Sequence, residues 1–157
     1  MTTVYLGLGS NVGDCRAQIE KAIELLTKKV TVQKLAPLYR TKPFGLLNQA
    51  DFLNSAVMGQ TDLNPEELLA FVKEIEQQVG RVKRVRWGPR EIDIDIIMYG
   101  SLIYHSHSLT IPHPGFVERD SVLVPLIDLD PELRDPVSGK TVTNLLKQLP
   151  LESRSVV

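Results

Sequence analysis

The sequence has few of the features that would place a protein outside the class of ordinary globular domains. It holds one cysteine, Cys15, which excludes an internal disulfide and fits a reducing compartment. No apolar run approaches the length of a membrane span. The net charge of −1 gives no reason to expect nucleic acid or an anionic membrane as a partner. The N-terminus lacks the basic and apolar segments of a signal peptide, so we expect a cytoplasmic location.

Length and composition predict a single domain spanning residues 1–157. The chain is 43% hydrophobic and 24% charged, which is ordinary for a soluble domain, and 157 residues can bury a core without disulfides. There is no internal repeat, no low-complexity segment and no linker. We therefore expect neither a second enzyme domain within this length nor an obligate protein partner.

Hydrophobic periodicity and turn residues predict an antiparallel sheet with helices, in the order βαββαβ. The predicted elements are strands at 3–9, 30–39, 51–60 and 91–99 and helices at 14–29 and 64–79. In the second helix, the segment Asn64–Glu67 supplies a cap, a first-turn proline and a capping-box glutamate, and Gly80 ends it. This order is typical of a ferredoxin-like α+β fold with its helices on one face of the sheet.

Two further segments have simpler interpretations. Residues 109–129 predict a loop and a short helix, and a last short helix is expected at 141–149, capped by Thr141 or Thr143. Gly7 and Gly9 lie at the end of the first predicted strand and lead into a helix, as in a phosphate-binding loop. Because the third glycine and the lysine of such loops are missing, we interpret the glycines as a tight backbone turn.

The most informative segment is RWGPREIDIDII, residues 86–97. Isoleucine at every second position alternates with Asp93 and Asp95, so a strand would bury the isoleucines and place both carboxylates on its other face. Two carboxylates roughly 6–7 Å apart along a strand repel each other unless a cation or a shared proton intervenes. Mg²⁺ prefers oxygen ligands and takes only one or two from protein when phosphates are present. The pair indicates a metal–nucleotide site, with a solvated strand edge as the alternative.

A cluster of cations precedes the two acids. Its members fall within ten residues: Arg81, Lys83, Arg84, Arg86 and Arg90. Arginines and divalent cations both bind phosphate oxygens, so acids beside this loop are the components of a phosphoryl-transfer site. A solvated loop is the alternative, although Trp87 and the Gly88-Pro89 pair shape the segment. Trp87 offers a flat face for a base or for loop closure, or is an ordinary packed tryptophan.

The histidines and one helical acid are weaker candidates. His105 and His107 form H-x-H in a loop with no further ligands nearby, so we do not expect them to bind a metal. His113 lies between two prolines that hold it rigidly and can aim it at a ligand. Glu76 follows the apolar stripe of the second helix, where a surface position is the default.

Taken together, these segments resemble the 6-hydroxymethyl-7,8-dihydropterin pyrophosphokinase family of folate synthesis. RWGPREIDIDII is similar to the family's signature, and further similar segments occur in order along nearly the whole chain: LGLGSNVGD, YRTKPFG, DFLNSAV, GRVKRVRWGPR, LTIPHPGFVER and VLVPL. The resemblance implies a ferredoxin-like fold, with ATP and the reduced pterin as substrates and two Mg²⁺ ions as cofactors. It also implies the reaction: the β,γ-diphosphate of ATP passes to the hydroxymethyl group, and AMP is released.

The resemblance also implies roles for individual residues. Asp93 and Asp95 match the metal ligands, and either could accept the proton of the substrate alcohol. Arg81, Arg90 and Asp95 match the catalytic residues. The positions implied for ATP binding are Glu76, Arg81, Lys83, Arg84, Trp87, Arg90, His113 and Arg119. The positions implied for pterin binding are Thr41, Pro43, Phe44, Phe52, Asn54 and Trp87. The loops around 40–50 and 81–90 are long enough to close over both ligands.

Two positions depart from the family pattern. Ser121 stands where relatives usually carry an aromatic that stacks on one pterin face. Since such stacking contributes about 1–3 kcal/mol, either the pterin binds roughly ten- to a hundredfold more weakly or another group, such as Phe116, covers that face. Val85 stands where an acid is common, which removes a countercharge from the basic loop.

Three alternative functions are open. A different phosphoryl or nucleotidyl transferase on the same scaffold would release ADP or pyrophosphate instead of AMP. A ferredoxin-like RNA-binding module would need exposed aromatics on central strands and a basic face, whereas only 6% of the residues are aromatic. A relative that lost its activity is the third, and Ser121 is the one indication of it.

Overall fold

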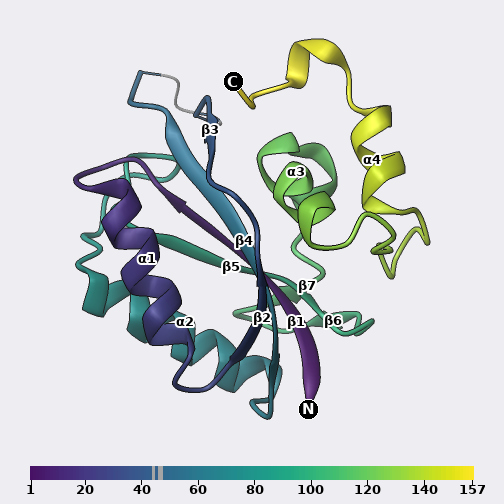
Figure 1. Cartoon of the computed structure of the whole chain (residues 1–157), viewed down its shortest axis with the longest axis horizontal. Helices are drawn as coiled ribbons and strands as arrows, with labels where there is room; N and C mark the ends of the chain where they lie inside the picture. Colours follow the sequence, from purple (N-terminus) through teal and green to yellow (C-terminus); the bar gives the residue numbers. More distant parts are fainter. Residues whose placement is uncertain (44, 46–47) are drawn as a thin grey trace.

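The computed structural model of the chain describes residues 1–43, 45 and 48–157, and its centre is an antiparallel five-stranded sheet (Figure 1). The strands are β1 (Thr2–Ser10), β2 (Thr31–Leu35), β3 (Tyr39–Thr41), β4 (Phe52–Thr61) and β5 (Asp93–Tyr99). Their order is β2-β4-β1-β5, and β3 also pairs with β4. With α1 (Cys15–Leu26) and α2 (Pro65–Val79), this arrangement confirms the predicted ferredoxin-like fold.

Side-chain caps determine where the first two helices begin. The Asp14 side chain accepts a hydrogen bond from the backbone of Ala17 and starts α1. Asn64 and Glu67 form the reciprocal capping box that starts α2, and Gly80 ends α2 in the left-handed conformation, with φ 115°. Local sequence therefore fixes both ends of the helix that leads into the basic loop.

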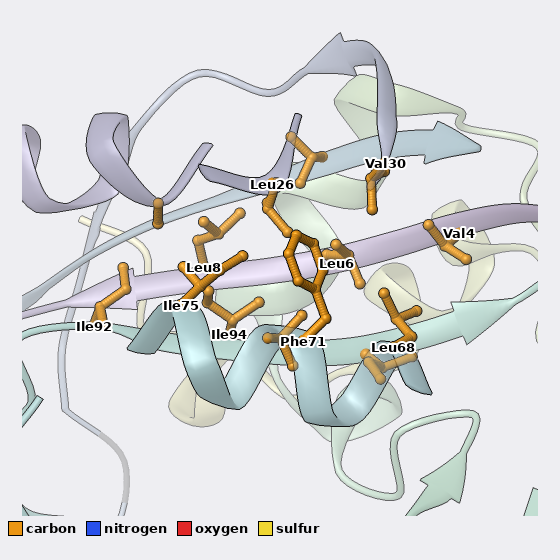
Figure 2. Close-up of a cluster of buried hydrophobic side chains, with 14 of the residues drawn as sticks. Val4, Leu6, Leu8, Leu26, Val30, Leu68, Phe71, Ile75, Ile92 and Ile94 are labelled. Carbon is orange, nitrogen blue, oxygen red and sulfur yellow. The ribbon is translucent and has the colours of Figure 1, made fainter. Parts of the chain in front are cut away.

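One face of the sheet packs against α1 and α2 around a buried core (Figure 2). The even-numbered residues Val4, Leu6 and Leu8 of β1 point into this core, as do Ile94 and Ile96 of β5. Each such side chain contributes about 1.5–3 kcal/mol through burial. Because side chains alternate along a strand, Asp93 and Asp95 of β5 face the other side of the sheet. This alternation ends at a register shift beyond Ile96, so that Tyr99 packs against the first core and Met98 against the second.

The second face is covered by C-terminal elements that the sequence did not place there. These elements are the short helix η1 (Phe116–Glu118), α3 (Asp120–Leu129) and α4 (Val142–Gln148), the last capped by Thr141. Phe116, Leu123 and Leu126 pack with Tyr5 and Ile97 of the sheet in a second buried cluster. The sheet therefore lies between two helical layers (Figure 1), and the expectation of helices on one face holds only for α1 and α2.

Three local predictions differ from the structure. Gly7 and Gly9 lie within β1 and not in a turn; the turn that follows contains Gly13, with φ 77°. The strand predicted at 30–39 is divided into β2 and β3 around Pro37, which has no N–H for the ladder. Residues predicted as a loop form a small ribbon of β6 (Tyr104–His105) and β7 (Thr110–Ile111).

The remaining element is the short helix η2 (Leu151–Ser153). Among the helices of the described residues, none is both long enough and apolar enough to cross a membrane.

Candidate active site

Asp93 and Asp95 extend from β5 on the face opposite the isoleucine core, as the alternation predicted. In the pairing of β1 with β5, Gly9 lies opposite Asp93 and Gly7 lies opposite Asp95. Glycine has no side chain, so β1 places none beside either carboxylate, and the Asn54 amide occupies the space at Gly9. These glycines therefore serve the site as small strand residues and not as a turn.

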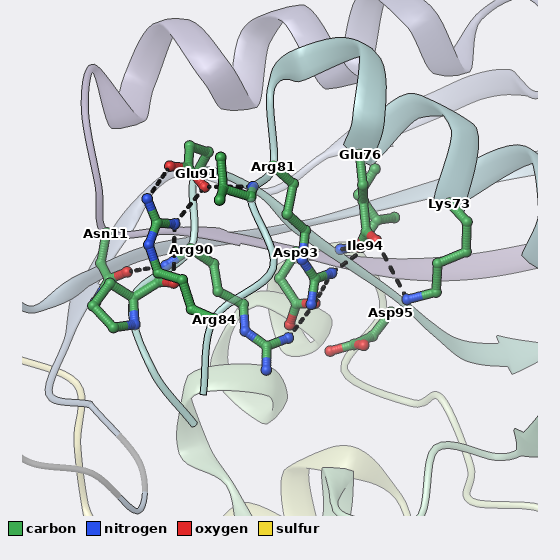
Figure 3. Close-up of polar contacts among 12 residues, drawn as sticks. Asn11, Lys73, Glu76, Arg81, Arg84, Arg90, Glu91, Asp93, Ile94 and Asp95 are labelled. Atoms are coloured by element: carbon green, nitrogen blue, oxygen red, sulfur yellow. Dashed lines mark hydrogen bonds and ion pairs between the residues drawn. The ribbon is translucent and has the colours of Figure 1, made fainter. Parts of the chain in front are cut away.

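Asp93 is the acid that brings the basic loop to the sheet (Figure 3). Its Oδ1 lies 3.3 Å from Nη1 of Arg81 and 3.2 Å from Nη1 of Arg90. All three side chains are between a fifth and a third exposed, so the cluster remains open to a ligand. Two of the predicted arginines therefore lie at the predicted acid, where they could also bind phosphate oxygens.

Asp95 is differently placed. Within the described part of the chain, the basic group within 4 Å of it is Nε2 of His113, at 3.9 Å from Oδ1, and no dashed line reaches Asp95 in Figure 3. Burial raises the pKa of Asp95 to about 7, and the negative charges of Asp93 and Glu76 add to this increase. A carboxyl group with this pKa can exchange a proton near neutral pH.

His113 presents one defined nitrogen to Asp95. The backbone N–H of Gly115 donates to Nδ1 of His113 over 3.2 Å, so the proton of the neutral ring is on Nε2, which faces Asp95. Burial, followed by the nearby charge of Arg119, lowers the pKa of His113 and favours this neutral form. The histidine is therefore a hydrogen-bond donor directed into the site.

Glu76 lies beneath the acid pair and not at the surface, so the local expectation for it is wrong. The residue is 2% exposed, and its carboxylate accepts a hydrogen bond from the backbone N–H of Ile94 over 2.8 Å. It also pairs with Arg81 at 2.8 Å and with Lys73 at 3.3 Å. A buried carboxylate with these partners positions Arg81 beside the site.

The basic loop carries its own countercharge. Both terminal nitrogens of Arg84 lie 2.7 Å from the carboxylate oxygens of Glu91, and this pairing lowers the pKa of Glu91 to about 2. Glu91 therefore neutralises part of the loop in which Val85 lies exposed. Lys83 is exposed, and it lines a cleft of about 480 Å³ between α2 and the loop, together with Lys73, Arg81, Arg84 and Arg90.

A second cleft, of about 120 Å³, brings together the acids and several residues implied for the pterin. Its lining includes Thr41, Phe52, Asn54, Trp87, Arg90, Asp93, Asp95, Arg119 and Ser121. Asn54 Nδ2 donates to Thr41 Oγ1 over 2.5 Å, which fixes the amide at the wall. Ser121 lies at the cleft, but Phe116 is buried in the second core, so Phe116 does not cover a ligand there.

Two of the residues implied for the pterin are not among those lining this cleft. Pro43 is buried and absent from its lining, and Phe44 lies outside the described residues. Trp87 provides a ring at the cleft, with the Arg119 guanidinium 5.1 Å from the ring centroid. A methyl group on Gly45 would lie 2.9 Å from Trp87, so Gly45 packs closely against the tryptophan.

A third cleft, of about 340 Å³, lies on the other side of Asp95. It runs between α2 and the β6–β7 ribbon, and its lining includes Leu69, Lys73, Ile96 and His113. Asp95 lines this cleft as well as the one beside Asn54. The acid therefore lies where two clefts of different character meet.

Sequence reasoning missed a junction of three loops built on Asn11. Oδ1 of Asn11 accepts the backbone N–H of Arg90 over 2.8 Å, and Nδ2 donates to Oε1 of Gln49 over 2.8 Å. Gln49 in turn donates to the backbone carbonyl of Trp87 over 2.6 Å. These contacts join residues 38 and 79 positions apart, so no local pattern indicates them.

The donor set fits a hard divalent cation in the company of a phosphate ligand. No group of three or more His, Cys, Asp and Glu side chains suited to a metal gathers among the described residues. The pair of Asp93 and Asp95 is thus too small for an all-protein metal site. Mg²⁺, however, binds through one or two carboxylates with phosphate and water completing its shell.

Fold and site together define a class of protein. A ferredoxin-like domain in which clefts meet at paired carboxylates and arginines has the components of a phosphoryl-transfer enzyme. The profile of one family, described as 7,8-dihydro-6-hydroxymethylpterin-pyrophosphokinase (HPPK), matches residues 5–131. This chain belongs to that family.

Individual relatives agree with this assignment. A 2-amino-4-hydroxy-6-hydroxymethyldihydropteridine pyrophosphokinase from Aquifex aeolicus is 44% identical over 140 residues, covering 89% of this chain and 88% of the relative. The folic acid synthesis protein fol1 of Schizosaccharomyces pombe is 41% identical over 93% of this chain, which spans 20% of that longer protein. A crystal structure of Plasmodium falciparum HPPK-DHPS superposes with a TM-score of 0.77 at 18% identity, covering 94% of this chain and 44% of that one. At this low identity, the similarity to the Plasmodium falciparum structure shows a shared fold alone.

Proposed function

We propose that residues 1–157 act as one pyrophosphokinase domain in folate synthesis. It transfers the β,γ-diphosphate of ATP to the hydroxymethyl group of 6-hydroxymethyl-7,8-dihydropterin and releases AMP. The observation that carries this proposal is the position of Asp95, where the cleft beside Phe52 and Asn54 meets the cleft beside Lys73 and His113. Two substrates in these clefts would bring their reacting groups together at the acid pair. Small soluble substrates of this kind fit a cytoplasmic enzyme.

The pterin is proposed to occupy the cleft beside β4. Phe52 and Asn54 lie on the same face of β4, so one can stack on the ring while the other hydrogen-bonds its edge. Trp87 supplies a second aromatic surface at this cleft. At about 120 Å³ the cleft is smaller than typical small-molecule sites of roughly 300–1,000 Å³. Binding therefore requires an outward movement of the lining, in which the segment 81–90 is the adjustable part.

ATP is proposed to bind across the cleft between α2 and the β6–β7 ribbon. Leu69 and Ile96 offer apolar contacts to the nucleoside, and Nε2–H of His113 donates a hydrogen bond toward it. Arg81, Arg90 and Arg119 bind the phosphates as they approach Asp93 and Asp95. Lys83 and Arg84 are adjustable members of the same loop, and Arg84 would exchange its contact with Glu91 for the phosphates.

The acids are proposed to hold two Mg²⁺ ions, with Asp93 and Asp95 as the protein ligands; when bound, these ions neutralise charge on the diphosphate. The protein itself orients the two substrates and stabilises the transferring group through its arginines. The alcohol oxygen of the pterin attacks the β-phosphorus, the bond from that phosphorus to the α-phosphate oxygen breaks, and AMP leaves. The Asp95 carboxylate accepts the proton of the alcohol.

A product assay tests this proposal. Purified protein is incubated with ATP, Mg²⁺ and 6-hydroxymethyl-7,8-dihydropterin, and nucleotides are separated over time. AMP that forms only when the pterin is present supports the proposal. ADP or pyrophosphate as product would indicate a different transferase, and ATP binding without any turnover would indicate a relative that lost its activity.

A further inference from the structure

The segment Ser155–Val157 lies alongside β3 as an additional short strand. The backbone N–H of Lys42 donates to the carbonyl of Ser155 over 2.8 Å, and the N–H of Val157 donates to the carbonyl of Arg40 over 2.9 Å. Thr41 and Val156 face each other in an antiparallel bridge between these two contacts. Figure 1 shows that the C-terminus lies close to β3 in space, although the two are far apart in the sequence.

A buried carboxylate holds this segment in place. Asp120, in the first turn of α3, is 2% exposed. It accepts hydrogen bonds from the backbone N–H of Ser155 over 2.8 Å, from the hydroxyl of Ser155 over 2.5 Å and from the backbone N–H of Val156 over 2.9 Å. Hydrogen bonds to an ionised group are roughly twice as strong as neutral ones. Asp120 therefore ties α3 to β3 through the 155–157 segment.

Both ends of this connection reach the proposed pterin cleft. Arg119 and Ser121, the neighbours of Asp120, line that cleft from α3. Thr41 and Lys42, which flank the bridge to Val156, line it from β3. Thr41 also accepts the hydrogen bond that fixes the Asn54 amide. The distance between the two walls of the cleft therefore depends on the contacts of Asp120.

We propose that Asp120 and the 155–157 segment form a positioning clamp that sets the width of the pterin cleft and so the affinity for the pterin. This inference rests on the proposed function. Asp120 touches neither substrate and acts through Thr41, Lys42, Arg119 and Ser121. A contact between the Tyr39 hydroxyl and Asp128 also joins β3 to α3, so loss of the clamp shifts the walls without separating them.

The test compares two variants that remove similar contacts at different places. Asp120→Asn removes the negative charge that strengthens these hydrogen bonds and leaves one amide oxygen in place of two carboxylate oxygens, so the three contacts can no longer all be made as they are. Asp135→Asn is the matched control, because Asp135 is 4% exposed and also accepts three hydrogen bonds, from Val137 and Ser138, at a turn outside the pterin cleft. Pterin affinity is measured by calorimetry with Mg²⁺ and a non-hydrolysable ATP analogue at saturation.

The clamp predicts that Asp120→Asn raises the Kd of the pterin about tenfold, equal to about 1.4 kcal/mol. The Kd of the ATP analogue stays within about twofold, and Asp135→Asn changes neither value. Val156→Pro is a second variant for the case that Asp120→Asn does not fold; it deletes one N–H donor to Asp120 in a part-exposed segment, and the same rise in pterin Kd is expected.

Pterin affinity that is unchanged in every folded clamp variant would overturn the clamp and leave the proposed function intact. An equal loss of affinity for both ligands, or the same loss in Asp135→Asn, would also overturn it, since either indicates a general structural defect. Absence of pterin binding and of AMP formation in the unaltered chain would overturn the proposed function, and the clamp with it.

Discussion

A methyl group placed on Gly9 would lie 2.6 Å from Oδ1 of Asn54. Cβ atoms do not approach an oxygen this closely, so the amide of Asn54 can occupy its position only because β1 carries glycine there. The two residues face each other directly in the pairing of β1 with β4. The lack of a side chain at Gly9 on β1 therefore allows Asn54, a proposed ligand-binding residue, to take its position on β4.

The first prediction follows from this contact. Gly9→Ala forces the Asn54 side chain to move and thereby weakens its hydrogen bond to the pterin, so we expect the KM for the pterin to rise about tenfold, as for the loss of one good hydrogen bond. Gly7→Ala is the control, because its methyl group would meet the nearest atom, Cδ1 of Ile97, at 3.4 Å. Steady-state kinetics of AMP release measure both variants. Equal KM values for the two variants would argue against a role of Gly9 in placing Asn54.

The second prediction concerns the aromatic surfaces at the pterin cleft. Because Trp87 lines this cleft beside Ser121, we expect Trp87→Ala to weaken pterin binding by roughly ten- to a hundredfold, the range for loss of one stacking contact. Ser121→Phe introduced into Trp87→Ala should recover part of this loss by supplying a ring from α3. Titration of pterin fluorescence measures all three proteins. Pterin affinity that does not change in Trp87→Ala would show that the tryptophan contributes no stacking.

The third prediction separates the two acids. Asp95 lies where the clefts meet, so Asp95→Asn is expected to reduce kcat by about a hundredfold or more, with a smaller effect on the KM for ATP. Asp93 pairs with Arg81 and Arg90, so Asp93→Asn is expected to change the KM for ATP more strongly. Initial rates over a matrix of both substrate concentrations measure these parameters. Normal turnover of Asp95→Asn would reject Asp95 as the proton acceptor.

The fourth prediction is a pH dependence of stability that arises from Glu66, away from Asp93 and Asp95. Hydrogen bonds from Tyr104, Ser106 and Ser108 lower the pKa of Glu66, the α2 residue that holds the β6–β7 ribbon. A carboxylate with a lowered pKa stabilises the fold above its ordinary pKa of 4.5, and this contribution disappears as the pH falls through the folded-state value. Glu66→Gln should therefore unfold at lower urea concentration than the unaltered chain at pH 7, and the difference should shrink at pH 3.

Glu20→Gln is the control for this experiment, because Glu20 is an exposed carboxylate on α1. Urea titrations from pH 7 to pH 3 compare the three proteins. A difference between Glu66→Gln and the unaltered chain that stays constant over this range would contradict the assignment.

Much of the fold could be predicted because its determinants are local. The caps of α2, the alternation of β5 and the shared face of Phe52 and Asn54 are all encoded within a few neighbouring residues. Such patterns fix which side chains share a face, and this was sufficient to place both acids opposite the core.

The parts that could not be predicted depend on contacts between distant segments. The three loops joined at Asn11 and the burial of Glu76 arise only when the tertiary structure forms. Similarly, nothing within residues 116–148 indicates which surface their apolar side chains cover, so the second helical layer was not foreseen. Short-range sequence patterns show which side chains share one face of a strand or helix. Which other element packs against that face depends on the tertiary structure of the whole chain.

The alternation of β5 has a consequence for how this protein can evolve. A single inserted or deleted residue before Asp93 would turn the strand over, sending the carboxylates into the hydrocarbon interior and exposing isoleucine to the cleft. A single shift of register would therefore disrupt both the hydrophobic core and the acid pair. The register of this strand cannot change one of them without changing the other. Changes in length are expected to be tolerated in the neighbouring loops, and the strand itself is expected to vary only by substitution.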